Sequence, residues 1–411
     1  MNVFDTLKER GFVSQCSNEE GLRKLLGSER VTCYIGFDAT APSLHIGNLL
    51  QVLFLSHLQR AGHRPIALMG GGTTRIGDPS GKTEMRKILP VETIAANVEV
   101  FRRQVGRFID FSGDKALLLD NAEWLAPLNY IEFLRDIGKH FSVNRMLSFE
   151  TYKMRLETGL SFIEFNYQVL QSFDYLTLFR RHGCRLQMGG DDQWGNIVAG
   201  MDLIRRIEGV EAFALTSPLV TRSDGKKMGK TEAGALWLDP GMTRPYDFYQ
   251  YWVNVPDEDV KQFLLRFTFL PVAEINDLCV VVNDQRINEA KRRLAREITT
   301  LVHGEDAARE AAEAARAAFG GGAEGADLAG VPSVQIPKKE LSAGIGIVDL
   351  LVRTKLCPTK SDARRLVSQG GASVGGKSVT DLEARVTDAD AENGAILLRA
   401  GKKRHFRIIV A

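Results

Sequence analysis

Residues 31–51 read VTCYIGFDATAPSLHIGNLLQ and combine a strand, a loop and the start of a helix. The first seven residues are rich in β-branched and aromatic side chains, as is typical of a buried strand. From His45 to Ala61, large apolar residues recur every three or four positions, which predicts a helix with one apolar face. A strand followed by a helix is the unit from which parallel α/β sheets are built.

The same alternation continues through the first half of the chain. Further strands are expected at 65–71, 116–121, 184–190 and 213–220, and further helices at 93–109, 129–141, 164–181 and 193–208. This order predicts a parallel sheet covered by helices on both faces. Ligands bind such sheets outside the carboxyl ends of the strands, and the glycines at 36, 70–72 and 189–190 lie at ends of this kind.

The second half has a different composition. Residues 244–319 read as helical and end in a run rich in Ala, Glu and Arg, after which a glycine-rich stretch has the signature of a linker. The net charge of the 411 residues is only +2, but residues 342–411 carry 12 Lys and Arg against 7 Asp and Glu. A local basic excess of this kind is compatible with a nucleic-acid partner.

Cysteine usage and hydropathy exclude several classes of protein. The five cysteines form no C-x-x-C pair and are odd in number, which argues against a disulfide framework and a structural zinc site. The N-terminal residues have no long apolar core, and no run of about 18 apolar residues occurs. We therefore expect a protein of the reducing cytosol, without a signal peptide or a transmembrane helix.

Residues 77–83, GDPSGKT, look like the end of a phosphate-binding P-loop. The Walker A motif needs a glycine five residues before Gly81, but that position is Ile76, and Gly77 comes one residue late. Pro79 also lacks the N–H group that a phosphate cradle would use. The register therefore disfavours a P-loop nucleoside triphosphatase, and a surface loop of turn-forming residues is the simpler alternative at this stage.

Two other motifs suit an anionic ligand. His45-Ile46-Gly47-Asn48 lies in the first turn of a predicted helix, where N–H donors and the helix dipole favour phosphate, and where Gly47 would let a flat ring approach the backbone. SDGKKMGKTE, at 223–232, is a cationic loop after the last predicted strand. Taken alone, the first motif is equally compatible with an ordinary helix start. The second, taken alone, is equally compatible with a solvated basic turn.

Together, the two motifs resemble the HIGH and KMSKS signatures of class I aminoacyl-tRNA synthetases, with Asn48 in place of the final histidine and Gly229 in place of the first serine. Asn48 can still donate a hydrogen bond to phosphate, but without a charge. The stretches YIGFDATAPSLHIGN, GGGTTRIGDPSGKTEMR, YQVLQSFDY, QMGGDDQWGNI and KKMGKTE occur in the order seen in bacterial tyrosyl-tRNA synthetases. The resemblance extends over essentially the whole chain.

The resemblance implies a tyrosine site. The substrate hydroxyl would pair with Tyr34 and Asp174. The substrate amino group would be held by Asp78, Tyr167 and Gln171, and Gln193 would lie on the carboxylate side. Tyr167, Gln171 and Asp174 follow one another at i, i+4 and i+7, so they share one helix face.

The resemblance also implies that ATP, accompanied by Mg²⁺, is a substrate and that no cofactor is tightly bound. Thr40 and His45 would contact the γ-phosphate side, Asp192 would hold the ribose, and the pyrophosphate would be clamped by Lys82, Arg86, Lys227 and Lys230. The implied ATP-binding and catalytic set is completed by Asp38, Gly47, Asn48 and Thr231.

The implied architecture has a Rossmann-like parallel-sheet catalytic domain (1–221), an α-helical anticodon-side domain with the KMSKS-like loop (222–319), a flexible linker (320–342) and a small basic α+β RNA-binding domain (343–411). In the last domain Lys360, Arg364 and Arg365 would contact tRNA(Tyr), and SVGGKSV (373–379) reads as a tight turn between strands. A homodimer joined through 130–165 is implied, with no membrane partner.

Three other functions compete with tyrosine–tRNA ligation. A non-catalytic RNA-binding protein on a decayed synthetase scaffold would be expected to have lost its phosphate-handling residues, yet Lys82, Arg86, Lys227 and Lys230 are present. A triphosphatase is disfavoured by the register at residue 76. A tryptophan-specific enzyme is the nearest relative in function, but Tyr34, Asp174 and Gln171 suit a phenol better than an indole.

Overall fold

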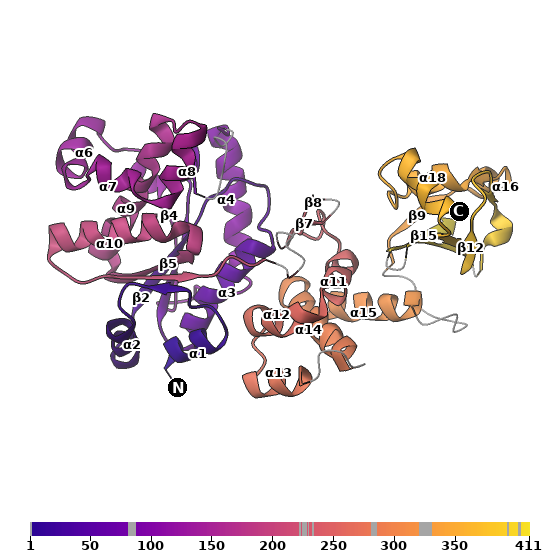
Figure 1. Cartoon of the computed structure of the whole chain (residues 1–411), viewed down its shortest axis with the longest axis horizontal. Coiled ribbons are helices and arrows are strands. Elements are labelled where there is room, and N and C mark those ends of the chain that lie inside the picture. Colours follow the sequence, from indigo (N-terminus) through magenta and orange to yellow (C-terminus); the bar gives the residue numbers. More distant parts are fainter. Residues whose placement is uncertain are drawn as a thin grey trace. The chain divides into compact units, whose positions relative to one another are not determined.

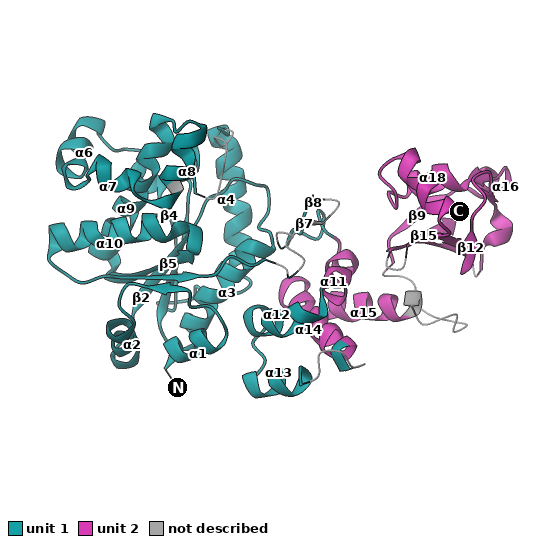
Figure 2. Ribbon diagram, viewed as in Figure 1, with its two compact units in different colours: residues 1–243, 256–287 teal, residues 244–255, 288–411 magenta. Residues whose placement is uncertain are grey.

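The computed structural model describes residues 2–80, 88–221, 223, 228, 230–231, 234–280, 286–319, 331–392, 394–401 and 404–411. The chain forms two compact units (Figure 2). The first consists of residues 1–243 and 256–287, and the second of residues 244–255 and 288–411.

A six-stranded sheet in the order β1-β6-β5-β2-β3-β4 forms the centre of the first unit (Figure 1). Its strands are β1 Gln15–Cys16, β2 Thr32–Phe37, β3 Arg64–Met69, β4 Leu117–Asp120, β5 Cys184–Gly190 and β6 Phe213–Ser217. All neighbours run parallel except β1, which is antiparallel to β6. The predicted parallel sheet is confirmed, and its strand order reverses between β2 and β5, where ligands bind folds of this type.

Helices cover both faces of this sheet, as the strand sequences require. α3 Ile46–Arg60 and α4 Val91–Val105 pack against β2 and β3, whereas α9 Phe162–His182 and α10 Trp194–Glu208 pack against β5 and against each other (Figure 1). Under α9, one apolar core joins Tyr34, Ile66 and Leu68 of the strands to Tyr175 and Leu176. Strands buried on both faces contain few polar positions, which explains their nearly continuous apolar sequences.

Shorter elements complete the first unit. The segment between β4 and α9 contains α5 Ala122–Leu125, α6 Tyr130–Asp136, α7 Val143–Leu147 and α8 Glu150–Thr158. The N-terminal helices α1 Val3–Glu9 and α2 Glu19–Ser28 are capped by the side chains of Asn2 and Asn18. After β6, β7 Lys230–Thr231 pairs with β8 Gly234–Ala235, and α12 Val260–Phe267 and α13 Val272–Leu278 follow.

The helices expected at 244–319 are present, but the boundary expected at 221/222 does not separate the compact units. α12 and α13 belong to the first unit, because α12 packs on α3 and Arg10 donates hydrogen bonds to the backbone oxygens of Leu265 and Thr268 at 2.9 Å each. The second unit contains α11 Pro245–Val253, α14 Arg286–His303 and α15 Glu305–Phe319. Over the described ranges, no helix has both the length and the hydropathy to span a bilayer.

A five-stranded sheet in the order β12-β11-β14-β15-β9 organises the C-terminal residues. The strands are β9 Ser333–Ile336, β11 Ala372–Val374, β12 Lys377–Val379, β14 Ala395–Ala400 and β15 Arg404–Val410, with a separate short pair of β10 Ile345–Gly346 and β13 Arg385–Val386. The helices are α16 Lys338–Ser342, α17 Ile347–Arg353 and α18 Lys360–Ser368. The predicted tight turn joins β11 to β12 at Gly375 and Gly376, whose φ angles are 53° and 78°.

The linker predicted at 320–342 is wrong at its C-terminal end. Residues 333–342 form β9 and α16, and Ile336 and Leu341 are buried in the C-terminal core. β9 pairs in parallel with β15, some seventy positions later in the chain. A four-residue edge strand next to a glycine-rich run shows no periodicity in the sequence. It can be recognised only from its pairing with β15 in the structure.

Candidate active site

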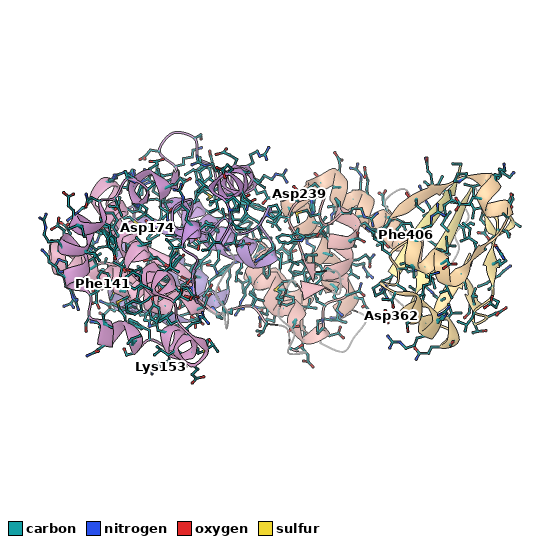
Figure 3. The ribbon with its side chains drawn as sticks, turned by 90° about the horizontal axis from the view of Figure 1, so that it is seen from above. Phe141, Lys153, Asp174, Asp239, Asp362 and Phe406 are labelled. Atoms are coloured by element: carbon teal, nitrogen blue, oxygen red, sulfur yellow. The ribbon has the colours of Figure 1, made fainter. Side chains whose placement is uncertain are left out.

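Asp174 lies in the middle of α9 and is only 2% exposed. Its carboxylate accepts hydrogen bonds from Asn121 Nδ2 at 2.9 Å and from Trp124 Nε1 at 2.7 Å. Burial raises the pKa of Asp174 to about 8, although both donated hydrogen bonds lower it. In Figure 3 the label of Asp174 falls within the α/β part of the chain. A carboxyl group placed in this way can hydrogen-bond to a buried hydroxyl.

Tyr34, from β2, faces the same region and is 1% exposed. Burial, and then the charge of Asp174, raise the pKa of the Tyr34 phenol well above its ordinary value, so the phenol is neutral. Three buried polar atoms here, Tyr34 Oη, Gln171 Oε1 and Gln187 Oε1, have no hydrogen-bond partner among the described residues. Orphaned buried polar atoms cost free energy and are rare in native proteins, so this group suits a polar ligand that would complete it.

A second carboxylate, Asp38, lies just after β2. Tyr167 Oη donates to its Oδ2 at 2.8 Å, and Thr73 Oγ1 donates to its Oδ1 at 2.7 Å. Asn121 Nδ2 in turn donates to Thr73 Oγ1 at 3.0 Å, so Asn121 links the surroundings of Asp38 and Asp174. Burial and then Asp38 raise the pKa of Tyr167 well above its ordinary value, which keeps its hydroxyl a donor. The result is a fixed set of acceptors that suits a cation.

Asp78 and Gln193 meet although they are far apart in the sequence. Gln193 Nε2 donates to Asp78 Oδ2 at 2.7 Å, and Ser80 N donates to Asp78 Oδ1 at 2.9 Å. Asn196 Nδ2 donates to Gln193 Oε1 at 3.2 Å. Asp192 precedes Gln193 in the turn after β5 and is only partly buried. These residues therefore lie at the carboxyl end of β5, next to that of β2.

His45 is the N-cap residue of α3, and its imidazole ring accepts the capping hydrogen bonds. Its Nδ1 accepts hydrogen bonds from Gly47 N at 3.0 Å and Asn48 N at 3.4 Å, while Asn48 Oδ1 accepts from His45 N at 3.0 Å. Because Nδ1 is an acceptor, the proton of the neutral ring lies on Nε2. Asn48 keeps its NH₂ group as a donor. The imidazole also lies near Trp237, with ring centroids 6.1 Å apart.

Gly47 has a second reason to be glycine besides the approach of a flat ring. A Cβ atom at this position would lie 2.9 Å from His45 Cε1, closer than real side chains approach. Gly36 differs, because a Cβ there would meet nothing within 4 Å, and the residue is exposed although it lies within β2. The end of β2 is therefore open above its backbone, as a ligand site at the strand ends requires.

The structure brings together most of the predicted site, though not all of it is described. Thr40 is exposed at the carboxyl end of β2. Lys230 and Thr231 form β7, where only the backbone is described. Lys82, Arg86 and Lys227 lie outside the described residues, so their roles stay predictions. In the part of the chain that the structure describes, no group of three or more His, Cys, Asp or Glu side chains is arranged to hold a metal ion.

Comparisons with known proteins show to which family this chain belongs. Residues 27–320 match the family described as tRNA synthetases class I (W and Y), and residues 324–408 match the C-terminal domain described as tyrosine–tRNA ligase SYY-like. A tyrosine–tRNA ligase of Clostridium tetani is 54% identical over 409 residues, which cover 100% of this chain and 99% of the relative. The chain belongs to the tyrosine–tRNA ligase family.

Other tyrosine–tRNA ligases extend the comparison. That of Acetivibrio thermocellus is 53% identical over 407 residues and 99% of both chains. The crystal structure of a C-terminally truncated mitochondrial tyrosyl-tRNA synthetase from Aspergillus nidulans aligns with a TM-score of 0.68 at 30% identity, covering 76% of this chain and 92% of that one. The fold and family expected from the sequence motifs are thereby confirmed.

The sequence prediction missed three residues of this tyrosine–tRNA ligase site. Thr73, Asn121 and Trp124 supply the hydrogen bonds that orient Asp38 and Asp174. A signal for two of them existed, because Asn121 directly follows β4 and Thr73 lies four residues after β3, at strand ends where ligands bind. Trp124 had no such signal, since an indole on a short helix usually packs in a core.

Proposed function

We propose that the chain activates L-tyrosine with ATP and transfers the tyrosyl group to the 3′ end of tRNA(Tyr), using the site at the ends of β2 and β5. The observation that carries the proposal is the buried cluster of Asp174 with the orphaned Tyr34 Oη and Gln171 Oε1. A phenol that donates to Asp174 and accepts from Tyr34 would satisfy groups that otherwise cost free energy.

The amino-acid end of the substrate follows from the charges around it. Asp38 and Asp78 present carboxylates on the same side as Tyr167, so the substrate ammonium lies among Asp78, Tyr167 and Gln171. Gln193 holds the carboxylate side from the turn after β5, where its Nε2 already donates to Asp78. The pocket thus recognises both ends of tyrosine, and its polar floor disfavours the indole of tryptophan.

The chemistry of activation needs no general base, because the substrate carboxylate is already a nucleophile. It attacks the α-phosphorus of ATP, and pyrophosphate leaves with the electron pair of the broken P–O bond. Catalysis is therefore positioning and charge stabilisation. His45 Nε2–H, Asn48 Nδ2 and Thr40 donate toward the phosphates at the N-terminus of α3, and Asp192 holds the ribose.

Lysine and arginine side chains neutralise the departing pyrophosphate. Lys82, Arg86, Lys227 and Lys230 take this role, and Thr231 adds a hydroxyl. Mg²⁺ accompanying ATP would help to neutralise phosphate charge and would need no dedicated set of protein ligands. In the second step the terminal ribose hydroxyl of the tRNA attacks the carbonyl carbon of the adenylate, and AMP leaves. The reaction takes place in the cytoplasm, consistent with the cysteine usage.

Amino-acid-dependent ATP–pyrophosphate exchange tests this function. With all twenty amino acids assayed in turn, tyrosine is expected to support exchange, and tryptophan and phenylalanine to support almost none. Exchange with tryptophan but not with tyrosine would assign the chain to the other specificity of its family. Absence of exchange with every amino acid would favour a non-catalytic protein.

An apolar surface on α6 and α9 indicates a homodimer. Ile131 and Phe162 are 71% and 72% exposed, and Phe162 and Tyr130 line a hollow of about 360 Å³. Apolar groups of this size seldom remain in water on a monomer. A second copy of the chain fits best, because a two-fold interface places Phe162 of one protomer against the hollow of the other.

Phe162→Glu is expected to convert the dimer to monomers at micromolar concentration, because two buried carboxylates would face an apolar surface. Sedimentation velocity measures this directly. Val280→Glu, a matched change at an exposed apolar residue outside 130–165, is expected to leave the dimer intact. A wild-type monomer, or a dimer of unchanged strength in the Phe162 variant, would contradict the interface.

The C-terminal domain binds tRNA through α18. Lys360, Arg364 and Arg365 are exposed, while Ala363 and Val367 anchor the helix in the core. Two of the cations have acidic neighbours, since Lys360 lies 2.6 Å from Asp349 and Arg365 lies 3.0 Å from Asp362. Asp349 also faces the charge of Arg364, but this interaction is weaker than its pairing with Lys360.

The double change Arg364→Ala and Arg365→Ala is expected to weaken tRNA binding and to reduce the salt dependence of log K by about one unit per lost phosphate contact. Pyrophosphate exchange should be unaffected, because it does not involve tRNA. Lys24→Ala, at an equally exposed cation on α2, serves as the control. Unchanged tRNA affinity and salt slope in the double variant would show that α18 does not contact the nucleic acid.

A further inference from the structure

Asp191 is a half-buried carboxylate next to the proposed site, and no role has been given to it above. Its Oδ2 accepts a hydrogen bond from Ser14 Oγ at 2.6 Å, and its Oδ1 accepts one from Thr216 Oγ1 at 2.6 Å. Gln15 Nε2 lies 3.4 Å from Oδ1. Hydroxyl-to-carboxylate bonds of this length belong to the stronger class of hydrogen bonds.

These partners come from neighbouring strands of the sheet. Gln15 is paired with Thr216 between β1 and β6, and Thr216 is paired with Gly189 between β6 and β5. Thr216 is fully buried, so its hydroxyl needs an acceptor inside the protein. Asp191 itself is the first residue after β5. One side chain therefore ties the exit of β5 to the two strands that complete that edge of the sheet.

The turn that begins at Asp191 is held at both ends by side chains: Gln193 is bonded to Asp78 and Asn196, and Asp191 holds the start of the turn. It is the single 3₁₀ turn Asp191–Gln193, whose N-cap, Gly190, supplies no side-chain cap. A hydrogen bond from Trp194 N to Asp191 O closes the turn. Asp192 and Gln193, the other two residues of the turn, are those proposed above to hold the ribose and the substrate carboxylate. A displacement of Asp191 would therefore also displace Asp192 and Gln193.

We propose that Asp191 is a positioning residue for adenylate formation: its carboxylate, held by Thr216 and Ser14, fixes the turn that presents Asp192 and Gln193 to ATP and tyrosine. The proposal rests on the roles assigned to those two residues under the proposed function. The phenol end of the pocket, formed by Tyr34 and Asp174, is on other elements and does not depend on this turn.

The test uses the full-length variants Asp191→Ala and Thr216→Val in pyrophosphate exchange, with tyrosine binding measured separately at equilibrium without ATP. We expect kcat/KM for ATP to fall by about 10- to 100-fold, as small displacements of positioning groups do. The tyrosine Kd should rise by a smaller factor, because Gln193 is the residue of this turn proposed to contact tyrosine. Thr216→Val removes only a hydroxyl at nearly constant volume, so it reports on the contact even where Asp191→Ala folds poorly.

Double substitution and a distant control separate positioning from stability. Asp191→Ala combined with Thr216→Val should lose no more activity than Asp191→Ala alone, because both remove one contact. Asp114→Asn removes the charge of an exposed carboxylate that pairs with Arg30 and Arg64, and should leave the kinetics unchanged. Additive losses, or normal kinetics per titrated active site with only a lowered Tm, would overturn the proposal.

Asp192→Ala distinguishes failure of this inference from failure of the proposed site. If Asp192→Ala slows pyrophosphate exchange but Asp191→Ala does not, the positioning role of Asp191 is refuted while the proposed site stands. If Asp192→Ala leaves exchange unchanged, the assignment of the turn to ATP is wrong, and the role of Asp191 falls with it.

Discussion

Replacing Asp174 by asparagine is expected to lower kcat/KM for tyrosine by about 100-fold or more, equivalent to about 2.7 kcal/mol or more of transition-state stabilisation. The substrate phenol loses one of the two carboxyl oxygens with which it can hydrogen-bond, whereas phenylalanine has no hydroxyl and never used them. The residual reaction with phenylalanine should therefore change little, and the preference for tyrosine should shrink by nearly the same factor. Exchange kinetics with both amino acids measure the two effects together.

The variant also has a predictable structural cost. Asn121 Nδ2 and Trp124 Nε1 both donate to Asp174, and an amide at this position offers only one oxygen to two donors. Trp124→Phe is the matched control, since it removes one donor and keeps the carboxylate, so tyrosine should still be strongly preferred. An Asp174→Asn enzyme that folds and keeps the full preference for tyrosine would refute the assignment.

The pH dependence of stability provides an independent check on Asp174. Its pKa in the folded protein is about 8, above its ordinary value of 3.8, so the folded state binds the extra proton between these values. The stability that comes from the neutral carboxyl is complete below about pH 4 and is lost as the pH rises through 8. The free energy of unfolding of the ligand-free wild type should therefore fall relative to Asp174→Asn from pH 5 to pH 8, as measured by urea denaturation at each pH.

Replacing His45 by alanine is expected to slow adenylate formation by about 100- to 1000-fold, as loss of one donor to developing charge does. Tyrosine affinity should be almost unchanged, because the ring is at the phosphate end of the site. The same change removes the N-cap of α3, at a cost of about 1 kcal/mol in stability. Single-turnover formation of the adenylate and thermal unfolding measure the two effects separately.

His45→Asn separates the two tasks of this residue. Asparagine is a good N-cap, so this variant should recover most of the stability that alanine loses. Its side chain is too short to reach as far as Nε2 of the imidazole, so adenylate formation should stay slow. Recovery of the rate together with the stability would mean that His45 acts only through the helix cap.

Long periodic elements were predictable from the sequence, and very short ones were not. The strands at 31–37 and 184–190 and the helix at 164–181 match β2, β5 and α9 within a few residues, because burial imposes a pattern on each. β1 has two residues and β9 has four, and both exist through pairing with distant strands. Local patterns carry no information on such pairing, which is why β1 was missed and the linker was drawn too long.

The membership of the site was predictable through the resemblance of its motifs. Asp38, Asp78, Asp174 and His45 were selected as members of one site on this basis, and their roles stay predictions. Asn121 and Trp124 were not selected, because their task is to orient Asp174, and amides and indoles have many ordinary uses. The roles of Lys82, Arg86 and Lys227 stay predictions from resemblance.

The strand order has a consequence for how the protein is made. β2, complete at residue 37, takes β3 as one neighbour early, but its other neighbour, β5, begins only at residue 184. β1 pairs with β6, which begins only at residue 213, so its partner is synthesised even later. During synthesis the N-terminal segment therefore exposes unpaired strand edges until about half of the chain has been translated, a period in which protection from aggregation matters most.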